Sequence, residues 1–484
     1  MKINKVALVS FRVLLAFSIL LFVFCFASIA QEGASSAAAS RIRYMADLGV
    51  MPASREVSVE DFVNYHRHQI GRPRVGEAVA MDVRWGNDQV SGADDEAILQ
   101  IGFSTPLVND RHQLPPLNLG LVIDRSGSMA DDDKMTRVKA SLLALVSQMR
   151  DSDVISITVF DSRAQVLLPA SRLTDRDYVN RLIRSIQPGG ATNLYAGLML
   201  GYNEVEKNYR KGITNRVILL TDGIANQGVT DPTEIAHDSL QFNNAGIDLS
   251  TIGVGLDLNR DLLSLLAKSG RGLFHFVAQS EDIQKVFVNE FQSLTSPVAE
   301  EPNVEIDFGK GLELEQVYGY SPHFRESGIT IKLDNMNNGL TQVILLRFRV
   351  ERQRRESSSL PVRVQFSYRD VDRNAQVVRG EEALLTINRH AGDMMDLLKD
   401  EEVGKNFTIA SLAQSIHDMA VAVESKRYRE AENLLTRAIN DAMQRYPDMS
   451  DKDIARPLAI AQKYQADLKR YNRQFDDKPD KENQ

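Results

Sequence analysis

Four short apolar runs, separated by segments with helical periodicity, are the feature that most restricts the fold of this chain. Nearly every residue in them is apolar, as expected of strands covered on both faces. The runs are Leu119–Ile123, Val154–Phe160, Val217–Leu220 and Leu249–Val254. Between the first two, apolar residues recur at helical spacing, with polar residues on the other side: Val138, Leu142 and Val146. This alternation predicts a doubly wound α/β domain, which we place at residues 116–298.

The regions on either side of this domain have a period of two instead. Between Val362 and Tyr368, apolar residues alternate with polar ones, which is typical of an antiparallel sheet with one buried face. Upstream of the domain, Ala78–Trp85 and Ala97–Phe103 also have the pattern of strands. We therefore expect residues 73–115 and 299–389 to form one antiparallel β-sandwich, into which the α/β domain is inserted.

Residues 1–30 have the pattern of a secretory signal peptide. Three basic residues precede an apolar run, Val13–Phe26, that only Ser18 interrupts, and the small residues of a cleavage site follow at Ser28-Ile29-Ala30. The chain is therefore expected to be exported, to the periplasm, the cell envelope or the medium. An uncleaved signal would instead leave a single N-terminal anchor. The only cysteine, Cys25, lies inside the apolar run, so the mature chain is expected to have no disulfide and no cysteine metal site.

Helices are predicted near both ends of the mature chain. Residues 31–72 are interpreted as a flexible leader followed by a short helical segment that Ser58 caps. Residues 390–476 are interpreted as a helical hairpin, a single helix–turn–helix unit of the tetratricopeptide type. The final residues, 477–484, are rich in Asp and Lys and are predicted to be disordered.

Composition and motifs argue against several functions. With a formal net charge of −8, the chain lacks the basic excess that general nucleic-acid binders use. It has no His-Glu-x-x-His metal motif, no Gly-x-Ser-x-Gly nucleophile motif and no phosphate-binding loop, so we expect that it is not an enzyme. His66 and His68 lie two residues apart, which on a helix would direct them to different faces, and both are interpreted as structural or solvated.

Three stretches that are far apart in the chain carry carboxylates and hydroxyls. They are Asp124-Arg125-Ser126-Gly127-Ser128, Gly190-Ala191-Thr192 and Thr221-Asp222-Gly223. The first and third follow predicted strands, and ligands collect beyond the carboxyl ends of parallel strands. Two carboxylates and three hydroxyls are hard oxygen ligands that suit Mg²⁺, or alternatively Mn²⁺ or Ca²⁺. Each stretch alone also has a structural interpretation, because Asp and Ser cap helices and Thr-Asp-Gly forms turns.

Taken in this order, the three stretches resemble the metal-ion-dependent adhesion site (MIDAS) of von Willebrand factor type A (VWA) domains. The runs Pro116–Leu119, Asn226–Pro232 and Val57–His66 are similar to those of a branch of exported bacterial proteins with one such domain. The resemblance implies a Rossmann-like fold over Leu117–Ser296. It also implies that five residues are the metal ligands, some of them acting through water: Asp124, Ser126, Ser128, Thr192 and Asp222.

These observations predict an exported binding or adhesion protein whose cation engages an acidic group of a protein partner. Residues beside the predicted ligands are candidates for partner contact: Asn193, Tyr195, Ile224 and Asn226. Two alternatives remain open. One is an envelope assembly scaffold in which the cation only stiffens the loops, and the other is a metal-dependent hydrolase, for which no general base stands out. Nucleic acid is not an expected partner, and a membrane is one only through an uncleaved signal.

Overall fold

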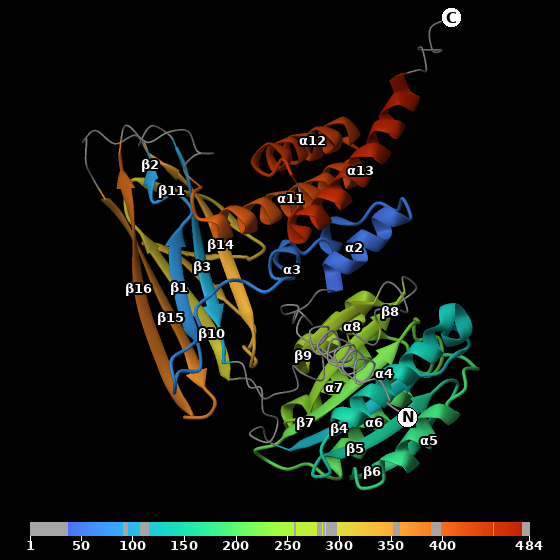
Figure 1. Ribbon diagram of the computed structural model, residues 1–484. Helices are drawn as coiled ribbons and strands as arrows, with labels where there is room; N and C mark the ends of the chain where they lie inside the picture. The colour runs from blue at the N-terminus through green and yellow to red at the C-terminus, as the bar shows by residue number, and fades with distance from the viewer. Residues whose placement is uncertain are drawn as a thin grey trace, which may run out of the picture.

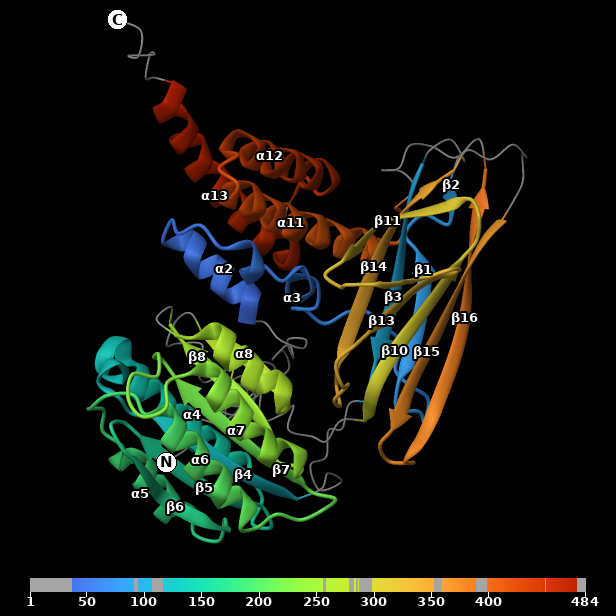
Figure 2. The same cartoon turned by 180° about the vertical axis from the view of Figure 1, so that it is seen from behind.

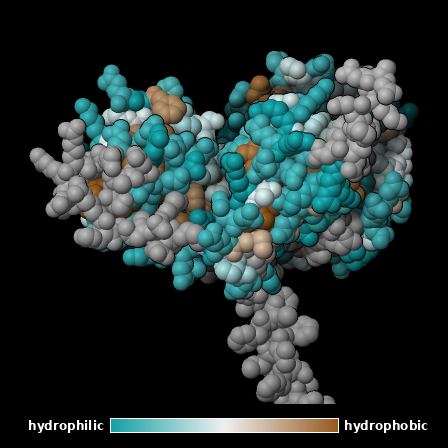
Figure 3. Space-filling view, turned by 90° about the horizontal axis from the view of Figure 1, so that it is seen from above, coloured by the Kyte–Doolittle hydropathy of each residue, from teal (hydrophilic) through white to brown (hydrophobic). Residues whose placement is uncertain are grey.

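The computed structural model describes residues 37–90, 95–106, 116–255, 258–277, 283, 286, 298–351, 359–388, 398–448 and 450–476. It has an α/β domain, a β-sandwich and a helical region (Figure 1; Figure 2). The predicted signal peptide and the predicted disordered tail lie outside the described residues. Among the helices described, none has both the length and the apolar character needed to cross a bilayer. Seen from above, the described surface is mainly hydrophilic, with hydrophobic residues in small, separate groups (Figure 3).

The α/β domain is built on a six-stranded sheet with the order β6-β5-β4-β7-β8-β9. Neighbouring strands are parallel, except that β6 pairs antiparallel with β5 at one edge. The strands are β4 (Leu117–Asp124), β5 (Val154–Phe160), β6 (Ala164–Arg172), β7 (Thr214–Thr221), β8 (Asp248–Val254) and β9 (Arg271–Val277).

Helices cover both faces of this sheet. One face packs against α4 (Lys134–Gln148) and α5 (Arg176–Ser185). The opposite face packs against three helices: α6 (Leu194–Glu206), α7 (Pro232–Asn244) and α8 (Arg260–Ser269). Because the strands are buried from both sides, the central residues of β4, β5 and β7 are mainly apolar. The predicted doubly wound α/β fold is confirmed.

Helix α6 lies very close to the central strand β4, and a small residue makes this possible. A Cβ atom added at Gly201 would lie 2.1 Å from Val122 Cγ2. A hydrogen bond from the Asn118 side-chain amide to the Val205 carbonyl oxygen, 2.8 Å long, joins the two elements further along. Since α6 begins shortly after Thr192, this packing fixes the position of one of the predicted metal-binding loops.

The β-sandwich is assembled from strands on both sides of the α/β domain. One sheet has the order β1-β3-β14-β11 and the other β12-β13-β10-β15-β16-β2. The strands are β1 (Ala80–Trp85), β2 (Gln89–Val90), β3 (Glu96–Ser104), β10 (Ala299–Phe308), β11 (Leu312–Tyr318), β12 (His323–Arg325), β13 (Gly328–Lys332), β14 (Thr341–Val350), β15 (Ser359–Asp370) and β16 (Ala375–Ile387). Strand β3 precedes the α/β domain and pairs antiparallel with β14, which follows it. The predicted insertion of the α/β domain into an antiparallel sandwich is therefore confirmed.

The described part of the C-terminal region contains three helices, one more than the predicted hairpin. Helices α11 (Glu401–Glu424) and α12 (Tyr428–Arg445) form the expected pair. Helix α13 (Lys452–Asp476) packs against both of them. The hairpin prediction did not distinguish α13 as a separate element, and this helix contains Pro457, a residue that usually interrupts a helix interior.

The N-terminal segment is helical where a flexible leader was predicted. Residues Ala37–Asp47 form helix α2, whose buried Ile42 and Met45 share a core with the C-terminal helices. The same helix also contacts strand β9, so it lies between the helical region and the α/β domain (Figure 1; Figure 2). The prediction was wrong for this part because an Ala-rich segment that finds an apolar surface to cover gains enough from burial to fold. Helix α3 (Val59–Val63) is capped by Ser58, as predicted.

Replacing Gly201 by alanine is expected to destabilise the α/β domain. The added methyl group would overlap Val122, and overpacking of this kind costs about 1–3 kcal/mol. The free energy of unfolding, measured by urea denaturation, should fall by this amount. Gly309→Ala is the matched control, because a Cβ atom there would have no neighbour within 4 Å. Equal losses in the two variants would contradict the close contact between α6 and β4.

Candidate metal centre

The first motif forms a compact turn at the carboxyl edge of the α/β sheet. Asp124 ends strand β4, and its Oδ1 accepts a hydrogen bond from the Ser126 amide at 2.7 Å. The chain continues into a short 3₁₀ segment, Gly127–Asp133, which brings Ser128 back beside Ser126. The two serine hydroxyl oxygens lie 3.2 Å apart. The local backbone therefore places both hydroxyls on the same side of the turn, next to the Asp124 carboxylate.

Asp222 joins this group from the neighbouring strand. It follows β7, which pairs parallel with β4, and its Oδ1 accepts a hydrogen bond from the Ser128 hydroxyl at 2.8 Å. The preceding Thr221 donates its hydroxyl to Asp124 Oδ2 at 2.5 Å, which links the two strand ends directly. Both carboxylates are buried, with Asp124 0% and Asp222 3% exposed. The two acids and two serine hydroxyls thus form one continuous hydrogen-bonded group.

Thr192 comes from a third loop, which the backbone holds against the other two. The Gly127 amide donates to the Gly190 carbonyl oxygen at 3.0 Å. The Thr192 amide donates to the Asn226 side-chain oxygen at 2.8 Å. A Cβ atom added at Gly223 would lie 3.5 Å from Thr192 Oγ1, which places this hydroxyl beside the turn after β7. The structure therefore gathers all five predicted ligand residues in three adjoining loops at one edge of the sheet.

A lysine that the sequence analysis did not identify lies in the same group. Lys134 is the first residue of α4, and its Nζ donates to Asp222 Oδ2 at 2.8 Å and to the Ser128 carbonyl oxygen at 3.4 Å. Its side chain is only 16% exposed. The available signal was its position, since it opens the helix that directly follows the first motif. Lys134 therefore neutralises one of the two buried carboxylates.

The other carboxylate, Asp124, is held by neutral donors. Burial raises the pKa of Asp124 to about 6, while hydrogen bonds from Thr221 and Ser126 oppose this rise and the charge of Asp222 adds to it. Two buried carboxylates with one lysine leave one negative charge that these neighbours do not balance. Carboxylates and hydroxyls together fit a hard divalent cation, which prefers oxygen ligands.

The four candidates for partner contact are of two kinds. Three of them have structural partners. Asn193 accepts a hydrogen bond from a backbone amide and caps α6, Asn226 holds the backbone of the third loop, and Tyr195 donates its hydroxyl to Asp238 on α7. Ile224, in contrast, is 55% exposed on the loop after β7. Of the four, Ile224 is the side chain best placed to touch a partner.

Residues 118–289 match the family model of the von Willebrand factor type A domain. This chain contains a VWA domain. The VWA domain coincides with the six-stranded sheet and its covering helices. All three loops that carry the predicted ligands lie inside it, at the edge where parallel strands of such a fold place their ligands.

Relatives of this VWA protein occur in bacteria and in mammals. The uncharacterized protein YfbK of Escherichia coli (strain K12) is 29% identical over 278 residues, which are 56% of this chain and 48% of that protein. The uncharacterized protein sll0103 of Synechocystis is 27% identical over 39% of this chain and 44% of its own length. Inter-alpha-trypsin inhibitor heavy chain H3 of Mesocricetus auratus is 27% identical over 44% of this chain and 25% of its own length. This chain therefore spans less than half the length of these curated relatives.

Solved structures of VWA proteins are also similar to this chain. The von Willebrand factor type A protein from Catenulispora acidiphila is 14% identical, covers 81% of this chain and 96% of its own, and has a TM-score of 0.48. The ArnB paralog VWA2 from Sulfolobus acidocaldarius is 18% identical over 81% of this chain and 98% of its own, with a TM-score of 0.40.

The variant Lys134→Met is expected to bind Mg²⁺ more tightly than the wild type. The lysine ammonium competes with a divalent cation for Asp222 and repels it, so its removal should improve binding by about 1 kcal/mol, or roughly fivefold in Kd. Isothermal titration calorimetry measures this change. Lys139→Met is the control, because Lys139 lies on the same helix but donates to the Arg184 carbonyl oxygen on α5. Weaker Mg²⁺ binding by Lys134→Met would show that the lysine supports the loop instead of competing.

Proposed function

We propose that this chain is an exported binding protein whose VWA domain uses a divalent cation to engage an acidic group of a protein partner. The observation that carries the proposal is the convergence of Asp124 and Asp222 with the hydroxyls of Ser126 and Ser128 at one edge of the sheet. The cation is Mg²⁺, with Mn²⁺ or Ca²⁺ as substitutes, because the donors are all oxygen. When bound, such a cation supplies a positively charged coordination position that a carboxylate of the partner can occupy.

The position of the loops supports presentation to a partner. The chain enters the VWA domain at Leu117, and Asp124 lies at the other end of β4, an 8-residue strand. At about 3.3 Å per residue, the candidate centre is roughly 25 Å from the end of the domain that is linked to the sandwich. Ser128 and Ile224 are exposed beside the buried carboxylates. A partner can therefore approach the centre and meet an apolar side chain next to it.

The scaffold alternative, in which a cation only stiffens the loops, has less support. Direct hydrogen bonds between backbone groups already join the loops. The Gly127 amide bonds to the Gly190 carbonyl oxygen, and the Asn226 amide bonds to the Thr192 carbonyl oxygen at 3.1 Å. Because these hydrogen bonds join the loops directly, the main contribution of a cation is expected to be to binding.

A hydrolytic role also has less support, and we propose that the chain is not an enzyme. A metal-dependent hydrolase needs a general base beside the cation. Asp161, a carboxylate that follows the neighbouring strand β5, is ion-paired with Arg125 at 2.8 Å and so already has a partner. Lys134 is ion-paired with Asp222.

Loss of one carboxylate is expected to abolish cation-dependent capture of a partner. Asp124→Ala removes a predicted ligand and with it one of the two negative charges that attract the cation. The immobilised protein is incubated with an envelope extract in Mg²⁺ or in EDTA, and the retained proteins are identified by mass spectrometry. We expect a partner that the wild type retains only in Mg²⁺ and that Asp124→Ala does not retain.

Matched measurements separate this function from its alternatives. Asp177→Ala removes an exposed carboxylate on α5 and should leave capture unchanged. Circular dichroism checks that Asp124→Ala remains folded. Capture that is equal with and without EDTA would reject the proposal. Thermal stabilisation by Mg²⁺ without any effect on capture would favour the scaffold. Turnover of a phosphate ester that is lost in Asp222→Ala would favour the hydrolase.

A further inference from the structure

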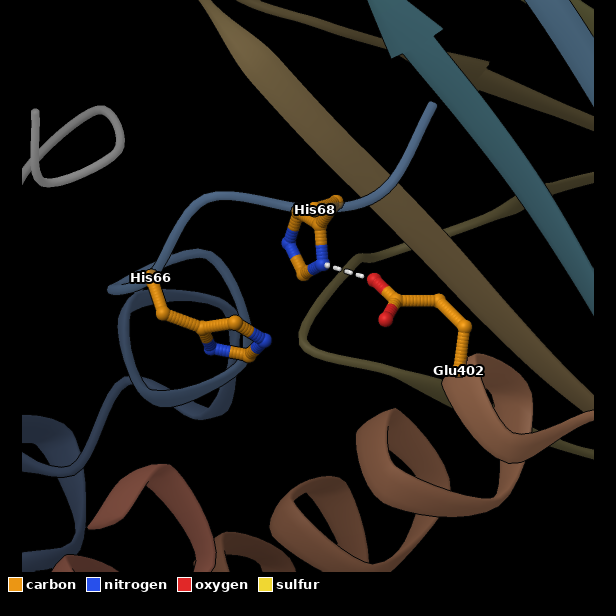
Figure 4. Close-up of side chains that lie close together, drawn as sticks. All are labelled: His66, His68 and Glu402. Carbon is orange, nitrogen blue, oxygen red and sulfur yellow. Dashed lines mark ion pairs between the residues drawn. The ribbon is translucent and has the colours of Figure 1, made fainter. Parts of the chain in front are cut away.

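A second group of possible metal ligands lies outside the VWA domain. His66 and His68 follow helix α3, and Glu402 lies in the first turn of α11 (Figure 4). One ligand atom from each of these residues lies within 4.8 Å of the other two. The expectation that the histidines point to different helix faces is wrong, because α3 ends at Val63 and the chain beyond it places the two rings 4.6 Å apart.

All three side chains are buried and their positions are fixed by neighbours. His66 is 7% exposed, His68 3% and Glu402 9%. His66 Nε2 lies 3.1 Å from the side-chain oxygen of Asn406, which is one turn after Glu402 on α11. One oxygen of Glu402 also accepts a hydrogen bond from the Gln69 amide at 3.0 Å. The group is therefore a preformed interior cluster and not a set of surface side chains.

The hydrogen bonds of His68 show which of its two ring nitrogens carries no hydrogen atom in the neutral ring. The side-chain oxygen of Asn64 accepts a hydrogen bond from the Val343 amide at 2.8 Å, so it must also be the acceptor toward His68 Nε2 at 3.1 Å. In the neutral ring, Nε2 then carries the proton and Nδ1 carries a lone pair. His68 Nδ1 has no hydrogen-bond partner among the described residues, and its lone pair lies 3.5 Å from Glu402 Oε1. The same carboxylate oxygen accepts hydrogen bonds from the Gln69 amide at 3.0 Å and from the Asn406 side-chain amide at 3.4 Å. The unprotonated nitrogen and this oxygen thus lie as two ligands of one cation could.

Lys405 lies one turn after Glu402 on α11, but its ammonium pairs with Asp451 and Asp453 at the start of α13. The cluster therefore places a buried carboxylate between two buried imidazoles, where a bound cation would add a positive charge.

We propose that His66, His68 and Glu402 form a structural zinc site. Imidazole nitrogens and carboxylates are ligands that Zn²⁺ takes, whereas Mg²⁺ prefers oxygen alone. Ligand atoms around a tetrahedral zinc ion, each about 2.1 Å from it, are about 3.4 Å apart, and His68 Nδ1 and Glu402 Oε1 already match this spacing at 3.5 Å. His66 Nε2 donates to the Asn406 oxygen, because the Asn406 amide donates to Gln100, so to ligate zinc the His66 ring would carry its proton on Nδ1 instead.

The site would join three parts of the molecule. The histidines belong to the segment between α3 and β1, and Glu402 belongs to α11. Asn406 also donates a hydrogen bond to Gln100 on strand β3 of the sandwich, at 2.8 Å. The burial of every ligand leaves no room for a substrate, so the ion stabilises this junction. The zinc site uses different residues and a different ligand class from the centre in the VWA domain, and it does not depend on the proposed function.

Zinc titration of the purified protein tests this proposal. The protein is first stripped of metal with a chelator, and excess Mg²⁺ is then added to occupy the centre in the VWA domain. Calorimetry with Zn²⁺ is expected to show one tight equivalent, and Zn²⁺ is expected to raise the melting temperature. Titration with Co²⁺ is expected to give the visible absorption of a low-coordinate ion with nitrogen ligands.

Variants locate the ion. Glu402→Gln keeps the shape of the side chain, and His66→Gln is a second variant in case the first does not fold. Each should weaken Zn²⁺ binding by about tenfold or more and remove the gain in melting temperature. His323→Gln alters an exposed histidine on β12 and should bind as the wild type does. Asp124→Ala should also retain the tight equivalent, because it alters only the VWA centre.

Two results would overturn the zinc site. One is the absence of a tight Zn²⁺ equivalent in the wild-type protein. The other is tight binding that both Glu402→Gln and His66→Gln leave unchanged, since the ion would then be bound elsewhere. If neither variant folds, the Co²⁺ spectrum of the wild type decides, and a spectrum of an ion with six oxygen ligands would reject the site.

Discussion

The parallel pairing of β4 with β7 is the interaction on which the candidate metal centre depends. Its register places Ile123 opposite Leu220, so the next residues, Asp124 and Thr221, end their strands side by side. The hydrogen bond from Thr221 to Asp124 then joins the two strand ends. A register shift of one residue would turn one of these side chains to the other face of the sheet. The backbone ladder of the sheet thus supplies the stability needed to hold two like charges close together.

The charges of the two buried carboxylates are only partly compensated by their neighbours. Isolated buried carboxylates are costly, and the cluster offsets this cost with hydroxyl donors, the Ser126 amide and Lys134. These donors are arranged around the carboxylates without fully neutralising them. The oxygen atoms of this group already lie close together. Binding of a cation would therefore require little reorganisation of the loops. The negative charge that is not balanced is what connects the fold to the proposed binding function.

The polar junction outside the VWA domain follows the same logic with other ligands. His68 and Glu402 come from segments more than three hundred residues apart, and only the packing of α3 against α11 and the sandwich brings them together. Here the group combines ring nitrogens with a carboxylate. The described residues therefore include two buried polar clusters, one of carboxylates and hydroxyls in the VWA domain and one of imidazoles and a carboxylate at the junction. Each group lies where strands or helices from distant parts of the sequence meet.

The sequence by itself determined the α/β domain, its insertion into a sandwich and the residues that come together in the candidate metal centre. Apolar strands covered on both faces and motifs placed directly after them are local patterns, and a parallel sheet brings such strand ends to one edge. Only the tertiary structure decided the rest. Lys134 reaches Asp222 through the turn of a 3₁₀ segment, α2 folds because a neighbouring surface buries it, and His66 meets His68 because α3 ends at Val63. These features depend on contacts between distant segments and on where one helix stops, and neither leaves a periodic trace in the sequence.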